Sequence, residues 1–105
     1  MLDKLKAIKD RFQEVERLIS APDAMSDMEL YVQLNKEYKD LGPIVDAYHK
    51  YKNIVSNITS SKEILKEEKD EEMREMAKME LDDLLPRKQE MDEEIKVLLI
   101  PKEPA

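Results

Sequence analysis

The chain of 105 residues is long enough for one domain, and hydrophobic and charged residues each make up 41% of it. With one glycine and no cysteine, it offers neither a glycine-rich phosphate loop nor a disulfide or thiolate site. Its net charge of −7 repels phosphate, so no direct nucleic-acid site is expected. No apolar run approaches the roughly 20 residues that span a membrane, and the charged start is not a signal peptide. The absence of cysteine fits a cytosolic protein.

A regular row of apolar residues opens the chain and predicts a first helix from about Leu2 to Ser20. The row repeats at steps of four and three residues: Met1, Leu5, Ile8, Phe12, Val15 and Ile19. Pro22 restricts the backbone of the residue before it, which predicts a break after this helix. Ser26 is expected to open the second helix, because Glu29 follows it at the spacing of a capping box.

Gly42 and Pro43 interrupt the second helical segment. Pro43 has no N–H group and its ring presses on a carbonyl one turn earlier, which favours a break. The apolar row nevertheless stays in phase across the pair, from Leu41 to Val45, so a kink is favoured over a turn. The segment ends in the charge run 66–69, where it could turn or continue as one rod. A hairpin is preferred, because a rod would need a partner from another chain.

The last helix is expected to begin after Asp70 and to end at the proline at position 101. Asp70 suits an N-cap, and two glutamates follow it in the first turn, where the helix dipole favours carboxylates. A heptad seam runs along this helix: Ala77, Leu81, Leu84, Met91, Ile95 and Leu98. Lys88 occupies a seam position and should lay its alkyl chain along the seam while its ammonium group stays in water. Pro86 should bend the helix.

These segments predict an all-α fold, an antiparallel bundle of three long helical segments with the middle one kinked or split near Gly42 and Pro43. Residues 1–100 are assigned to a helical N-terminal domain, and residues 101–105 to the start of an extended linker. The predicted core consists of Leu5, Ile8, Phe12, Val15, Tyr51, Ile58, Leu81, Leu84 and Ile95.

No combination of residues in the sequence indicates chemistry. His49 is the single histidine, whereas zinc normally needs three or four protein ligands, so a partly exposed helix residue is expected. The carboxylates lie in polar runs and lack the buried setting that raises a pKa for acid–base work. Met73, Met76 and Met79 could form an adaptable binding surface, but we expect them to fill the core. The sequence therefore predicts no enzyme and no catalytic, cofactor-binding or metal-binding residues.

Two motifs resemble the N-terminal domain of the bacterial peptide chain release factor 1 family. One is the segment 73–77, Met-Arg-Glu-Met-Ala, and the other is the exit 98–104, Leu-Leu-Ile-Pro-Lys-Glu-Pro. The start of the chain also fits, so the resemblance covers all 105 residues. Glu103 departs from the family pattern, in which aspartate is usual, and the segment 68–70 replaces an Asp-Asp-Pro turn.

This resemblance implies a domain of a cytoplasmic factor that directs translation termination at UAA and UAG codons. In that family, ester hydrolysis rests on a Gly-Gly-Gln loop and codon reading on a Pro-x-Thr loop, and neither sequence occurs in this chain. The resemblance further implies contact with the stalk base of the large ribosomal subunit and interplay with release factor 3. It carries over no functional residue. The alternative is a free-standing coiled-coil adaptor or dimerisation module.

Overall fold

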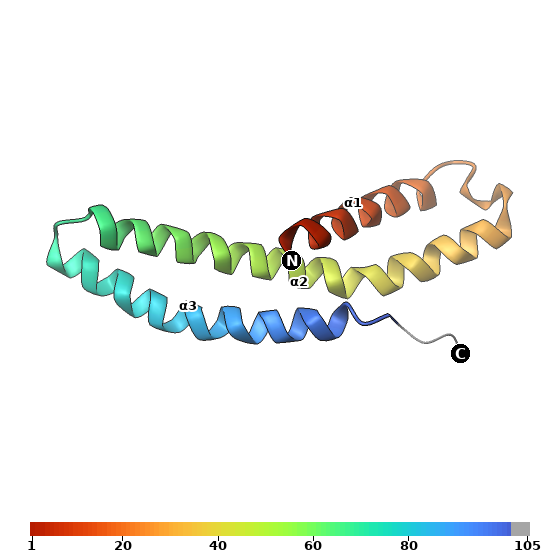
Figure 1. The fold of residues 1–105 in the computed structure, drawn as a ribbon. Coiled ribbons are helices and arrows are strands. Elements are labelled where there is room, and N and C mark those ends of the chain that lie inside the picture. The colour runs from red at the N-terminus through yellow and green to blue at the C-terminus, as the bar shows by residue number, and fades with distance from the viewer. Residues whose placement is uncertain (102–105) are drawn as a thin grey trace. The chain divides into compact units, whose positions relative to one another are not determined.

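A computed structural model of the chain describes residues 1–101. Within that range lie three α-helices and one short 3₁₀ helix: α1 Leu2–Ile19, η1 Ala24–Ser26, α2 Met28–Glu67 and α3 Glu71–Leu98 (Figure 1). None of the described residues forms a strand, so the predicted all-α class is confirmed. None of the helices in that range combines the length and the apolar composition of a membrane span. Of the expected linker, residues 102–105 lie outside the described part of the chain.

The chain divides into two compact units, Met1–Tyr48 and His49–Ala105, and the boundary falls inside α2. In the first unit, α1 and the first part of α2 form a pair of antiparallel helices (Figure 1). In the second unit, the rest of α2 pairs in the same way with α3 (Figure 1). The bundle of all three segments stays a prediction.

The core of the first unit lies between α1 and α2, and its α1 boundary agrees with the predicted one to within a residue. Leu5 and Val15 are buried as predicted, whereas Ile8 and Phe12 are only half-buried. The Phe12 ring stacks on that of Tyr38, with the ring centres 4.7 Å apart and the planes at 14°. Phe12 remains partly open because the ring that covers it is itself 38% exposed.

The structure corrects the predicted start of α2 by one residue. Ser26 belongs to η1, where its N–H donates to the carbonyl of Asp23 at 3.0 Å. Asp27 has the extended backbone of an N-cap, and its carboxylate accepts the N–H of Leu30 at 3.1 Å. The expected cap at Ser26 is therefore wrong, because the 3₁₀ turn after Pro22 already uses the backbone of that serine.

Helix α2 continues through Gly42 and Pro43 without a break, so the split alternative is wrong. Proline removes only one backbone hydrogen bond from the helix. The apolar row continues in phase after Pro43 and keeps Val45 and Tyr48 buried, which favours a continuous helix. Helix α3 likewise continues through Pro86. A bend at either proline stays a prediction.

Residues 68–70 separate α2 from α3, so the two helices do not form one rod. The Glu68 carboxylate accepts two backbone N–H groups of this turn, each at 3.0 Å. Asp70 has an extended backbone, and its carboxylate accepts the N–H of Glu72 at 3.1 Å. The predicted hairpin turn and the predicted cap at Asp70 are confirmed.

The core of the second unit is formed by the facing seams of α2 and α3. Each residue that was predicted as core in this unit is buried: Tyr51, Ile58, Leu81, Leu84 and Ile95. Leu65 and Met91 pack against the cluster of Ile54, Ile58, Leu81 and Leu84. Ser61 is buried here although its side chain is polar, and the sequence did not indicate it.

The predicted core role of Met73, Met76 and Met79 is wrong, because these side chains are 46%, 65% and 71% exposed. They follow one another at steps of three, and each such step falls about 60° short of a full helical turn. The three side chains therefore move around α3, away from the row of Ala77 and Leu84 that faces α2.

Candidate functional site

Lys88, at its predicted seam position, forms a polar cluster with Tyr51 and Asp92 in the second unit. Its Nζ atom lies 5.5 Å from the centre of the Tyr51 ring and donates to Oδ2 of Asp92 at 3.1 Å. The Tyr51 side chain is buried, whereas the two charged side chains are partly exposed. The alkyl chain of Lys88 thus follows the seam, and its partly exposed ammonium group is held by a carboxylate.

The electrostatics of this polar cluster keep each member in its ordinary charge state at neutral pH. Burial raises the pKa of the Tyr51 hydroxyl, and hydrogen bonding with Asp92 raises it further, against the opposing effect of Lys88. The hydrogen bond to Asp92 raises the pKa of Lys88. Burial raises the pKa of Asp92, but hydrogen bonding with Tyr51 and Lys88 outweighs this and lowers it. No member titrates near neutrality, so the cluster suits helix pairing and not proton transfer.

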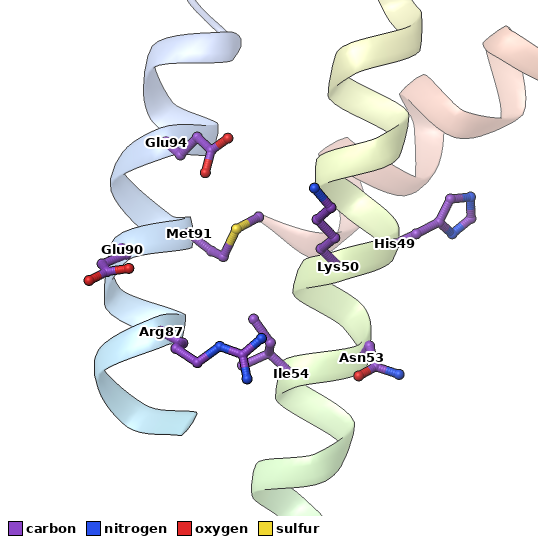
Figure 2. A pocket seen from close by; sticks show the side chains of 8 residues that line it. All are labelled: His49, Lys50, Asn53, Ile54, Arg87, Glu90, Met91 and Glu94. Carbon is purple, nitrogen blue, oxygen red and sulfur yellow. The ribbon is translucent and has the colours of Figure 1, made fainter. Parts of the chain in front are cut away.

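A groove of about 410 Å³ runs between α2 and α3 in the second unit. Its lining residues are His49, Lys50, Asn53, Ile54, Arg87, Glu90, Met91 and Glu94. In Figure 2, Met91 reaches across the groove, whereas His49 and Asn53 point away from α3. The charges that line the groove balance, so it selects neither an anion nor a cation. His49 is exposed, in line with the expectation.

The described residues, 1–101, contain no group of three or more His, Cys, Asp or Glu side chains placed to hold a metal ion. Arg87 in the groove is paired with Asp83, with Nη1 and Oδ2 3.4 Å apart.

Arg74 secures the turn between α2 and α3, a role that the sequence reasoning missed. Its Nη1 donates to the carbonyl of Leu65 and, at 3.4 Å, to that of Glu68. Carbonyls at a helix C-terminus lack partners within the helix, so this guanidinium satisfies them. The sequence did contain a signal for this contact: an arginine one turn after the capping Asp70 can reach back to the end of the preceding helix.

The first unit carries its own polar contact between α1 and α2. Arg11 donates to both carboxylate oxygens of Glu37, from Nε at 2.6 Å and from Nη2 at 2.9 Å. This hydrogen bonding lowers the pKa of Glu37. The pair lies at the surface beside the stacked rings of Phe12 and Tyr38, so it joins the helices from outside the core.

Three proteins that are similar to this chain carry the same name, and a domain family matches it as well. Residues 8–105 match the PCRF domain. Peptide chain release factor 1 of Cytophaga hutchinsonii is 56% identical over 104 residues, which are 99% of this chain and 29% of that protein. The proteins of the same name from Clostridioides difficile and Amoebophilus asiaticus are 44% and 45% identical, with the same coverage. The chain thus spans 29% of the length of these relatives. No solved structure matches it significantly.

Proposed function

This chain belongs to the PCRF domain family, and we propose that it is the N-terminal helical domain of a peptide chain release factor that directs termination at UAA and UAG codons. The observation that carries the proposal is the match of 99% of the chain to peptide chain release factor 1 proteins, at up to 56% identity among those described above. The two motifs at residues 73–77 and 98–104 point to the same family. The chain spans 29% of such a protein, so codon reading and ester hydrolysis are proposed for the remainder.

We propose that these residues act by binding and have no active site of their own. The Gly-Gly-Gln and Pro-x-Thr sequences do not occur in the chain. The polar cluster of Tyr51, Lys88 and Asp92 has pKa values shifted away from neutrality, which is unsuited to acid–base work at physiological pH.

The proposed partner is the stalk base of the large ribosomal subunit, with functional interplay with release factor 3. The net charge of −7 favours contact with ribosomal protein over contact with RNA. A weak contact is sufficient, because the rest of the factor tethers the domain and raises its effective concentration. A free-standing dimerisation module has less support, since the α3 seam is already covered by α2 within the second unit.

Release of formyl-methionine from ribosomes halted at a stop codon tests this proposal. The assay compares the chain, the full-length factor and a factor that lacks residues 1–100. We expect no release by the chain alone, and we expect slower or weaker termination by the shortened factor, with ester hydrolysis spared at saturating concentration. Codon-dependent release by the chain alone would contradict the proposal. Complete loss of release by a correctly folded shortened factor would also contradict it, since the helices would then belong to the catalytic machinery.

A further inference from the structure

Three methionines form a continuous exposed stripe near the start of α3, here called the methionine surface: Met73, Met76 and Met79. Residues three apart on a helix have Cβ atoms about 5–6 Å apart, so the thioether side chains are neighbours. Single exposed apolar residues are ordinary on a protein surface, whereas a contiguous group indicates an interaction site. Methionine is flexible and polarisable, and it adapts to the shape of a bound partner.

The border of the methionine surface is acidic. At three or four positions from Met76 and Met79, each residue that is not methionine carries a carboxylate: Glu72, Glu75, Glu80, Asp82 and Asp83. Glu75 pairs with Lys78 at 3.3 Å, and Asp83 pairs with Arg87 at 3.4 Å. Among the described residues, the other three carboxylates have no ion-pair partner. The nearby Arg74 is directed to carbonyls of the α2 terminus.

A second pair of exposed methionines, Met25 and Met28 in the first unit, has a less acidic border, with Glu29 as the one carboxylate three or four positions from either of them. Their side chains are 62% and 56% exposed. The residues three or four positions from Met28 are uncharged: Ala24, Met25, Tyr31 and Val32. The chain therefore presents exposed methionines with many and with few surrounding carboxylates, which provides an internal control.

We propose that the methionine surface docks a basic amphipathic helical segment of a partner protein. The apolar face of that segment would cover the methionines, and its lysines or arginines would face Glu72, Glu80 and Asp82. Charge complementarity selects this occupant, since nucleic acid and anionic membranes would meet like charge. A second copy of the same surface would also bring carboxylates together. This docking does not depend on the proposed function, because it is argued from the side chains of α3 and not from the family match.

A short synthetic leucine–lysine peptide with an amphipathic helical pattern is the probe. It is titrated into the 105-residue chain labelled with ¹³C at the methionine methyl groups, so that the seven methionines report separately. We expect saturable shifts of the Met73, Met76 and Met79 signals and none of the Met25 and Met28 signals. A leucine–glutamate peptide of the same pattern should cause no shift. Equal shifts of all exposed methionines, or shifts that follow the concentration of the chain without peptide, would overturn the proposal.

Paired substitutions separate this docking from general attraction to an acidic protein. Met76→Gln with Met79→Gln should raise the Kd of the leucine–lysine peptide at least about tenfold, because exposed apolar anchors are lost at the centre of the contact. Met25→Gln with Met28→Gln is the control and should leave the Kd within about twofold. Glutamine is a good helix former for the exposed positions of α2 and α3, and Met25 is exposed in the short η1, so circular dichroism should be unchanged. Equal weakening by the two pairs would overturn the proposal.

The acidic border has its own test. Glu80→Lys with Asp82→Lys should weaken peptide binding about tenfold or more, and added salt should weaken binding to the unmodified chain by screening. Binding that withstands both changes would show that the border takes no part, and the proposed basic partner would be wrong.

Discussion

The two units both pair α2 with another helix, but they place their polar contacts differently. In the first unit, Arg11 and Glu37 meet at the surface, outside an apolar and aromatic contact. In the second unit, Lys88 stands within the α3 seam, where it meets the buried Tyr51 and is held by Asp92.

This difference indicates which contacts fix the alignment of the helices. An exposed ion pair is screened by water and salt and contributes little to stability. The ion pair of Lys88 with Asp92 lies within α3 and is partly exposed, so only the contact of Lys88 with the buried Tyr51 ring depends on the alignment of α2 with α3. We therefore expect apolar packing to dominate stability in both units, and polar contacts to matter more in the second.

The largest expected effect tests the apolar core of the second unit. Leu84 is 4% exposed, whereas its neighbour Leu85 is 45% exposed. Leu84→Ala should lower the free energy of unfolding by about 3 kcal/mol, since it leaves a cavity among Ile54, Ile58 and Leu81. Leu85→Ala should cost less than about 1 kcal/mol. Urea unfolding measures both, and similar losses would show that the α2–α3 seam is not the core.

A smaller effect is expected from the aromatic contact of the first unit. A fully buried phenylalanine costs about 3–5 kcal/mol when replaced by alanine, but Phe12 is only half-buried. Phe12→Ala should therefore cost about 2 kcal/mol, including the loss of stacking on Tyr38. Phe12→Leu should recover much of this loss, because it restores apolar area. Urea unfolding decides the matter, and a loss above about 4 kcal/mol would place Phe12 in a closed core.

Helical periodicity predicted the structural features that depend on a single helix. The bounds of α1, the cap at Asp70 and the buried seam of α3 could be predicted because apolar spacing and local capping determine them. The cap of α2 was predicted at Ser26 and lies at Asp27, because the 3₁₀ turn before it determines which residue is extended.

Features that depend on two helices could not be predicted in the same way. The contact of Lys88 with Tyr51 and that of Arg74 with the α2 terminus became known only from the alignment of α2 with α3. Asp92, in contrast, stands four residues after Lys88 on the same helix. The exposed methionines were misassigned because three-residue steps suit either the edge of a buried seam or a surface stripe. The sequence thus predicted the helices and most of the core, whereas contacts between helices needed the structure.

The smallest expected effect concerns the polar contacts and their dependence on pH. The pKa values of Tyr51 and Lys88 are raised, so their contributions to stability are complete below their ordinary pKa values and are lost as the pH rises above ~10. The pKa values of Asp92 and Glu37 are lowered, so their contributions are present above ~4 and are lost as the pH falls. Acid should therefore weaken both units, whereas alkali acts on the polar cluster of the second unit.

Tyr51→Phe should cost about 1 kcal/mol at neutral pH, the typical value for one hydrogen-bonding hydroxyl. It should also flatten the fall of stability above pH ~10, because the variant has no phenol to ionise at this position. Glu37→Gln, the matched change in the first unit, should leave this alkaline fall unchanged and flatten the acidic fall instead. Urea unfolding of both variants across the pH range measures the acidic and the alkaline fall of stability. If Glu37→Gln flattened the alkaline fall of stability as much as Tyr51→Phe, that fall would not come from the polar cluster. The contrast between the two units would then be wrong.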